Sequence, residues 1–135
     1  MSARTTLRWL LATLYLVAAG FHFTQPKPFM DVTPDWVPAK AAVVLWTGLA
    51  EGLGALALLQ PWSVPLRRAG GVGLALYAVC VFPANITHFA LDMGRGDGGL
   101  GLAYHLPRML LQPLLVWLAL WTGGVTSWPL ARRPS

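Results

Sequence analysis

The chain has 135 residues, of which 56% are apolar and only 11% are charged. Average soluble domains carry about 25% charged residues, so this composition argues against a soluble globular domain. The net charge of +5 would suggest nucleic-acid binding in a soluble protein, but the basic residues cluster at the ends of apolar runs, where lipid headgroups lie. We therefore expect a single membrane domain over residues 1–135, with the lipid bilayer around it and no nucleic-acid partner.

The first two apolar runs are each long enough to cross a bilayer. Thr5 to Thr24 follows a short basic start, and we expect it to be retained as a helix rather than cleaved as a signal peptide. Ala41 to Gln60 is the second run, about 30 Å long as a helix. The segment between them, Gln25 to Lys40, has four prolines, which predicts a stiff outer loop and not one continuous helix. The second run also carries two pairs of small residues at a spacing that lets helices approach closely: Gly48 with Gly52, and Ala50 with Gly54.

The second half of the chain also has two long apolar runs joined by a polar connection. Pro61 to Arg68 is a predicted turn, and Ala69 to Leu91 is the third run. A glycine-rich loop from Asp92 to Tyr104 leads to the fourth run, Leu106 to Gly123, with Pro107 expected in its first turn. The sequence therefore predicts an all-α membrane protein. We expect an antiparallel four-helix transmembrane bundle with a Pro-rich outer loop between the first and second helices, and spans at 5–24, 41–60, 69–91 and 106–123.

The distribution of charge predicts the orientation of this bundle. Four spans put both termini and the second connection on one side, which then carries six arginines and no acidic residue: Arg4, Arg8, Arg67, Arg68, Arg132 and Arg133. The other side carries four basic and four acidic residues: Lys27, Lys40, Arg95, Arg108, Asp31, Asp35, Asp92 and Asp97. Basic residues concentrate on the cytoplasmic side of membrane proteins. We therefore predict a bacterial-type inner (plasma) membrane location with both termini in the cytoplasm.

Few polar side chains interrupt the spans, and most of them fall near the outer ends. Polar groups in lipid are costly and need partners, so we expect them to converge. The sequence predicts a ligand-binding polar cluster in the outer half of the bundle, made of His22, Glu51, Asn85, His88, Arg108 and Gln112. His105 lies on the same face of the fourth span as the last two of these. Glu51 alone lies near mid-membrane, and we expect Arg108 or a histidine as its partner.

Pro83 and Glu51 each keep two interpretations. Pro83 should kink the third span because its ring removes the hydrogen bond to the carbonyl of Val79, and the kink serves either packing or a hinge. Glu51 either ties helices together by a hydrogen bond or accepts protons and contacts a ligand. The histidines could also hold a metal ion, or a haem between His22 and His88, but we rank both below a quinone and assign no metal-binding residue.

Several stretches of the chain are similar to one known family. Gly20-Phe21-His22-Phe23, Pro34-Asp35-Trp36-Val37-Pro38, Gly48-Leu49-Ala50-Glu51 and Phe82-Pro83-Ala84-Asn85-Ile86-Thr87-His88 together resemble the DoxX family of small four-helix membrane proteins, from about Leu7 to Leu120. The resemblance implies an inner-membrane bundle whose shared polar site contains His22, Glu51, Pro83, Asn85 and His88. For some members it implies a membrane subunit or partner of redox systems, either in sulfur-compound oxidation that feeds the quinone pool or in complexes that link superoxide detoxification to thiol balance. Animal relatives look more like assembly chaperones. The chain has one cysteine, Cys80, and lacks the second cysteine that a disulfide-exchanging relative would use.

Three functions follow from these observations. We favour a DoxX-like accessory subunit of a membrane redox system that binds a quinone or another small molecule, and as an enzyme the chain would be at most a membrane subunit of an oxidoreductase. The alternative is a non-catalytic scaffold or assembly chaperone, whose small-residue faces pack on a redox subunit, another membrane protein or a second copy of the chain. Transport of a small solute ranks last, because four short helices leave little room for alternating access.

Overall fold

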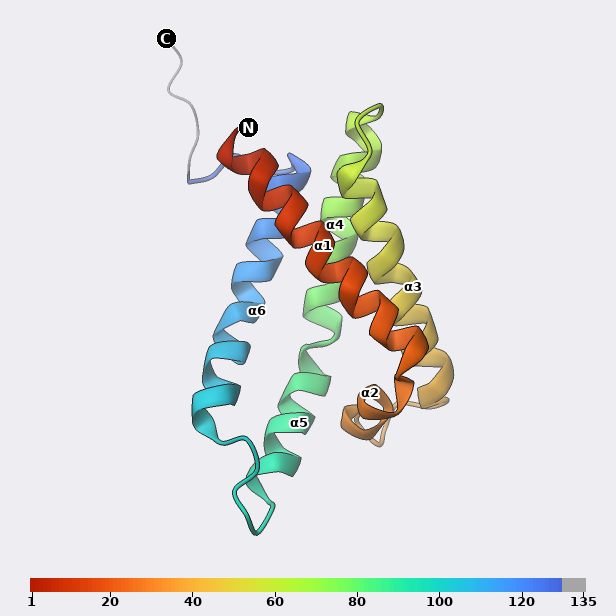
Figure 1. Ribbon diagram of the computed structural model, residues 1–135, viewed down its shortest axis with the longest axis vertical. Helices are drawn as coiled ribbons and strands as arrows, with labels where there is room; N and C mark the ends of the chain where they lie inside the picture. The colour runs from red at the N-terminus through yellow and green to blue at the C-terminus, as the bar shows by residue number, and fades with distance from the viewer. Residues whose placement is uncertain (130–135) are drawn as a thin grey trace.

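The computed structural model describes residues 1–129, and all the regular structure in this part of the chain is helical. Arg132 and Arg133, which the charge argument used, lie outside the described residues. Four long helices run side by side, α5 continues α4 beyond a break, and α2 lies across one end of the bundle (Figure 1). The helices are α1 (Ala3–Thr24), α2 (Pro26–Val32), α3 (Lys40–Leu59), α4 (Val64–Cys80), α5 (Phe82–Met93) and α6 (Leu102–Gly123).

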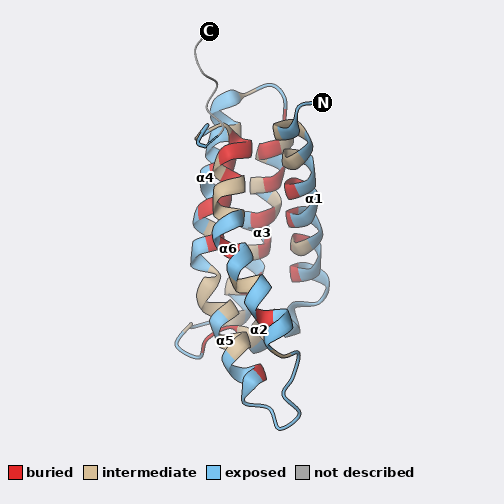
Figure 2. Ribbon diagram, turned by 90° about the vertical axis from the view of Figure 1, so that its left-hand side faces the viewer, coloured by how far each residue is buried: buried red, intermediate tan, exposed pale blue. Residues whose placement is uncertain are grey.

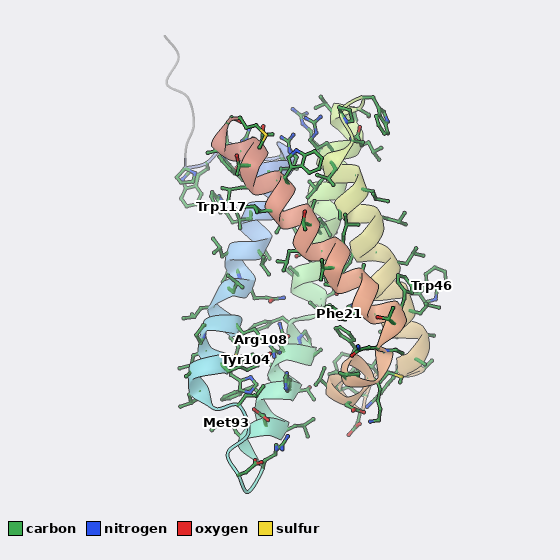
Figure 3. The ribbon with its side chains drawn as sticks, in the orientation of Figure 1. Phe21, Trp46, Met93, Tyr104, Arg108 and Trp117 are labelled. Atoms are coloured by element: carbon green, nitrogen blue, oxygen red, sulfur yellow. The ribbon has the colours of Figure 1, made fainter. Side chains whose placement is uncertain are left out.

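Three helical segments are long and apolar enough to cross a membrane: Ala3–Thr24, Lys40–Leu59 and Val64–Met93, the last made of α4 and α5 together. Large apolar side chains such as Trp46 project outward from them (Figure 3), as expected for a surface in contact with lipid. The chain is therefore a multi-pass helical membrane protein. The helix α6 has the same length as α1, 22 residues, but it is not among the three candidates. The polar side chains of Arg108 and Gln112 make it less apolar.

Two connections differ from the sequence prediction. The expected loop from Gln25 to Lys40 contains the short helix α2, which starts at Pro26 because proline fits the first turn of a helix, where its missing N–H is not needed. The expected turn from Pro61 to Arg68 is shorter than predicted. The side chain of Ser63 accepts a hydrogen bond from the backbone N–H of Leu66 and caps α4, so its two arginines belong to a helix.

The prolines of the second half also lie differently from the prediction. Pro107 is inside α6 and not in its first turn, because α6 begins earlier, at Leu102. The third span breaks at Val81, and α5 begins with Pro83 in its first turn. The break changes the direction of the chain, so α5 diverges from the upper bundle (Figure 1). This divergence leaves room beneath α4 for the site described below.

Small residues let neighbouring helices pack closely. A Cβ atom added at Gly48 of α3 would lie 2.5 Å from the Cβ of His22 in α1, and one added at Gly70 of α4 would lie 2.7 Å from the Cβ of Ala57 in α3. Distances this short exclude any side chain, so each glycine permits a close helix contact. The first of the two predicted small-residue pairs therefore faces α1 within the same chain.

The core lies in the half of the bundle that holds the N-terminus. Leu58, Leu74 and Ala119 are fully buried there, at 0% exposure. Buried residues are dense in this half and sparse toward α2 and α5 (Figure 2). At the same end, Arg8 donates from Nε to the carbonyl oxygen of Thr122 at 2.9 Å, so the start of α1 and the end of α6 are held together.

Candidate functional site

A cavity of about 470 Å³ lies in the loosely packed half, between the α1–α2–α3 side and the break between α4 and α5. Helix α2 and the loop after it contribute apolar side chains to its wall, including Phe29 and Trp36. Most of the lining is apolar, which suits a small lipid-soluble molecule. The ionisable and amide side chains in the lining are Tyr15, His22, Glu51, Tyr77, Cys80, Asn85 and Gln112.

His22 and Glu51 form a buried pair on one wall of this cavity. The Nδ1 atom of His22 lies 3.0 Å from Oε2 of Glu51, and both side chains are buried. The same Nδ1 lies 3.0 Å from the carbonyl oxygen of Ala18, one turn earlier in α1. The imidazole ring stacks on Phe29 of α2 with 3.8 Å between ring centroids. The pair therefore joins α1 to α3, and α2 covers it.

Two polar atoms on this wall have no hydrogen-bond partner among the described residues. One is Oε2 of Glu51: Nδ1 of His22 is close to it, but the direction does not suit a hydrogen bond. The other is the hydroxyl oxygen of Tyr15. Both residues are 4% exposed. A buried polar atom without a partner costs about 1–3 kcal/mol, so each one needs an explanation, and a bound ligand is one such explanation. A ligand that donates to a carboxylate and accepts from a phenol would satisfy both atoms.

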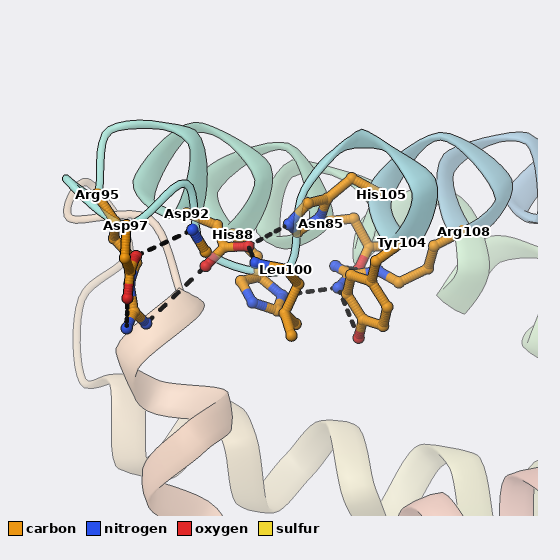
Figure 4. Close-up of polar contacts among 10 residues, drawn as sticks. Asn85, His88, Asp92, Arg95, Asp97, Leu100, Tyr104, His105 and Arg108 are labelled. Atoms are coloured by element: carbon orange, nitrogen blue, oxygen red, sulfur yellow. Dashed lines mark hydrogen bonds and ion pairs between the residues drawn. The ribbon is translucent and has the colours of Figure 1, made fainter.

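A second polar network joins α5 to α6. Arg108 of α6 donates from Nη2 to Oδ1 of Asn85 at 2.6 Å, and from Nη1 to Nδ1 of His88 at 2.6 Å (Figure 4). Arginine is always a donor, so Nδ1 of His88 is an acceptor in this bond. Tyr104 and Arg108 lie between α6 and α5 (Figure 3), with 3.4 Å between the tyrosine hydroxyl and Nη1. The guanidinium is the centre of the network.

This network reaches the cavity through two amides. Asn85 donates from Nδ2 to Oε1 of Gln112 at 3.1 Å, and Gln112 donates from Nε2 to the carbonyl oxygen of Ala78 at 2.7 Å. Ala78 lies in the last turn of α4, where helix carbonyls lose their intrahelical partners. Gln112 of α6 thus caps the broken span, and both amides form part of the cavity wall.

Of the six predicted residues, four line the cavity and two do not. His22 and Glu51 lie on one wall of the cavity and Asn85 and Gln112 lie on another, whereas the side chains of His88 and Arg108 do not line it. His88 and Arg108 lie behind Asn85, to which Arg108 is bonded. Of the partners expected for Glu51, a histidine is close to it, while Arg108 binds residues of α5.

The predicted polar cluster leaves out four polar residues that lie near its members in the structure. Tyr15 lies seven positions before His22, which is two helical turns, so the shared face was readable from the sequence. Tyr77 packs edge-on against Tyr15, with 6.0 Å between ring centroids. The sequence predicts a loop from Asp92 onward, but Asp92 lies near the end of α5 and is buried. Its Oδ2 atom lies 2.7 Å from Nε2 of His105, a residue that the sequence prediction notes for its helix face and among the histidines but leaves out of the polar cluster.

The loop after α5 has its own charges. Arg95 donates from Nε to Oδ1 of Asp97 at 3.2 Å, and both side chains are exposed. The backbone N–H of Gly99 and the guanidinium of Arg95 hold the pKa of the Asp97 carboxyl below its usual value. Asp97 is therefore ionised at neutral pH, and it lies outside both polar networks.

Comparison with models of known protein families gives a match over most of the chain. A family model described as "Domain of unknown function (DUF8561)" matches residues 11–123. These residues include every polar side chain of the cavity wall and of the network on α5 and α6. No curated protein and no solved structure shows significant similarity to the chain.

Proposed function

The chain belongs to the DUF8561 family, whose function is unknown, and we propose that this member binds a quinone or a similar small lipid-soluble molecule. The site is the cavity between α1, α3 and the break after α4. In this proposal the chain is a DoxX-like accessory subunit of a membrane redox system, and the electrons pass to or from a partner enzyme. The observation that carries the proposal is the buried Glu51 in a mainly apolar cavity: its Oε2 lies 3.0 Å from Nδ1 of His22 but receives no well-directed hydrogen bond from the described residues.

The chemistry of the two walls suits a quinol. A quinol hydroxyl can donate to Oε2 of Glu51, and a quinone carbonyl can accept from the hydroxyl of Tyr15. The second hydrogen on each amide nitrogen of Asn85 and Gln112 is free of the bonds described above and can donate to the other ring oxygen. Oxidation of a quinol releases protons, and an acid–imidazole pair such as Glu51 and His22 can accept them.

The same proposal treats α6 as a fourth span. A helix of 22 residues is about 33 Å long, enough to cross the hydrocarbon core. It packs along α4 and α1, and its polar side chains bond to α4 and α5 rather than facing lipid. Arg4, Arg8 and Arg67 then lie at one end of the bundle, which favours both termini in the cytoplasm of a bacterial cell and a cavity in the outer half.

The scaffold alternative has less support. It depended on the small residues of α3 as a free surface for a partner. A Cβ atom at Gly48 would overlap His22, and one at Gly52 would be 3.8 Å from the Cβ of Ala19, so α1 covers both positions. We therefore favour ligand binding over assembly for this helix face.

Titration with decylubiquinone tests the proposal. Quinones quench tryptophan fluorescence, and Trp36 lies in the cavity wall. The protein, purified in mild detergent, should show saturable quenching. Glu51→Gln should weaken binding about tenfold, because a hydrogen bond to a charged group contributes about 1.5–3 kcal/mol. Lys27→Gln, at an exposed position of α2, is the control and should bind as the wild type does.

A chemical probe provides an independent readout. Cys80 is exposed and lines the cavity, so N-ethylmaleimide should label it and decylubiquinone should protect it. Unsaturable quenching, or equal affinities of the wild type, Glu51→Gln and Asn85→Leu together with no protection of Cys80, would show that the cavity does not bind quinones.

A further inference from the structure

Two histidines and one aspartate lie close together at the far end of α5 and α6, outside the cavity wall. We propose that His88, Asp92 and His105 bind one divalent transition-metal ion of the zinc class. One donor atom from each residue lies within 4.8 Å of the other two. None of the three residues lines the cavity, so the proposed metal site does not depend on the proposed quinone binding.

The backbone brings the three donors together from two helices. His88 and Asp92 are four residues apart on α5 and share one face of that helix. His105 reaches them from α6, and its ring is perpendicular to that of His88 with 5.0 Å between centroids. The backbone N–H of Leu100 donates to Oδ2 of Asp92 at 2.6 Å and fixes the carboxylate (Figure 4). A tight loop between α5 and α6 therefore sets the geometry.

The donor types and their burial fit such an ion. Two imidazoles and one carboxylate suit zinc, which takes three protein ligands where a fourth position stays open to water or another molecule. Ligands on one tetrahedral zinc ion lie about 3.4 Å apart, so small side-chain rotations bring these donors onto a common centre. Asp92 is 5% exposed and His105 is 0% exposed, and Nδ1 of His105 has no hydrogen-bond partner among the described residues.

Arg108 is the internal competitor for this site. It donates to Nδ1 of His88, so this lone pair already faces a cation. A metal ion that takes the same lone pair displaces the guanidinium from His88. Removal of the guanidinium should therefore strengthen metal binding, whereas loss of a purely structural arginine would not.

Zinc titration of the full chain tests the site. The protein is purified in detergent on a tag without histidines, and zinc chloride binding is followed by calorimetry and by thermal unfolding. We expect one zinc ion per chain and a higher unfolding temperature in zinc. Asp92→Asn should weaken binding by at least about tenfold, since loss of even an outer-shell partner costs 10–100-fold. Arg108→Gln should bind zinc more tightly than the wild type.

Asp35→Asn is the matched control, because it removes the same charge from a fully exposed position in the loop after α2, where its partner is Lys40 and none of the three donors. It should bind zinc as the wild type does. Since His105 is fully buried and its removal can unfold the chain, His88→Gln and Asp92→Asn carry the test. Absence of zinc-dependent stabilisation, or equal losses in the Asp92 and Asp35 variants, would overturn the site. An unchanged affinity in Arg108→Gln would show that the ion does not take Nδ1 of His88, and an unchanged affinity in His88→Gln would remove His88 from the site.

Discussion

Gly71 of α4 and Gly123 of α6 pack backbone against backbone. A Cβ atom added at Gly123 would lie 2.9 Å from the Cα of Gly71, and one added at Gly71 would lie 2.7 Å from the carbonyl oxygen of Ala119. This contact fixes α6 beside α4 in the tightly packed half of the bundle. Because α5 leaves the axis of α4 after the break, the same α6 meets α5 through polar side chains in the other half.

The first prediction concerns this backbone contact. Gly71→Ala should lower the free energy of unfolding by about 1–3 kcal/mol, because backbone atoms cannot make room for a methyl group as a flexible side chain can. Gly73→Ala, two residues away, is the control, since a Cβ atom there meets nothing within 4 Å. Unfolding in mixed detergent micelles measures both. Equal stability of the two variants would show that α4 and α6 do not approach this closely.

The second prediction uses Gly48 and Gly52, one turn apart on α3. A methyl group at Gly48 would overlap the Cβ of His22, whereas one at Gly52 would make an ordinary contact of 3.8 Å with Ala19. Gly48→Ala should therefore displace His22 from Glu51 and weaken decylubiquinone binding, and Gly52→Ala should leave binding unchanged. The measurement is the fluorescence titration described above. A loss in the Gly52 variant alone would contradict this assignment of the helix face.

The third prediction concerns the guanidinium that joins α5 to α6. Arg108→Lys should loosen α5, because an ammonium group cannot span Asn85 and His88 with two bonds as a planar guanidinium does. Hydrogen exchange should become faster in residues 82–93, while α3 keeps its protection. Tyr104→Phe is the control, because the 3.4 Å contact of its hydroxyl is the weakest in the network. Equal exchange in wild type and Arg108→Lys would contradict this role.

The fourth prediction tests the orientation of the chain in the membrane. In a Cys80→Ala background, Asp97→Cys should react with a membrane-impermeant maleimide in intact spheroplasts, because the proposed orientation puts the loop after α5 outside. Trp62→Cys, in the exposed turn before α4, should react only after permeabilisation. Reaction of both from outside would show that the loop after α5 and the turn before α4 lie on the same side of the membrane, so that α4 and α5 do not cross it. The reverse pattern would place both termini outside the cytoplasm.

The positions of the first two long helices followed from the sequence, for a physical reason that depends on solvent. Hydrocarbon offers no hydrogen bonds, so long apolar runs must be helical, and the first and second predicted spans end within one residue of Thr24 and Leu59. Proline chemistry similarly put a disturbance beside Pro83. The first residues of α4 and α6 were harder to predict, because the cap formed by Ser63 and the place of Pro107 inside a helix depend on local geometry.

The choice of partners was decided only by the tertiary structure. Helical periodicity puts Arg108 and Gln112 on one face of α6, but it does not say which helix that face meets. The bend after Cys80 turns α5 toward Arg108, and the close contact at Gly48 brings His22 to Glu51. A charged side chain in lipid needs a polar partner, and this need can be predicted from the sequence alone. Which side chain meets it depends on how each helix is rotated and where the third span bends, and these follow from packing between helices rather than from the order of residues within one.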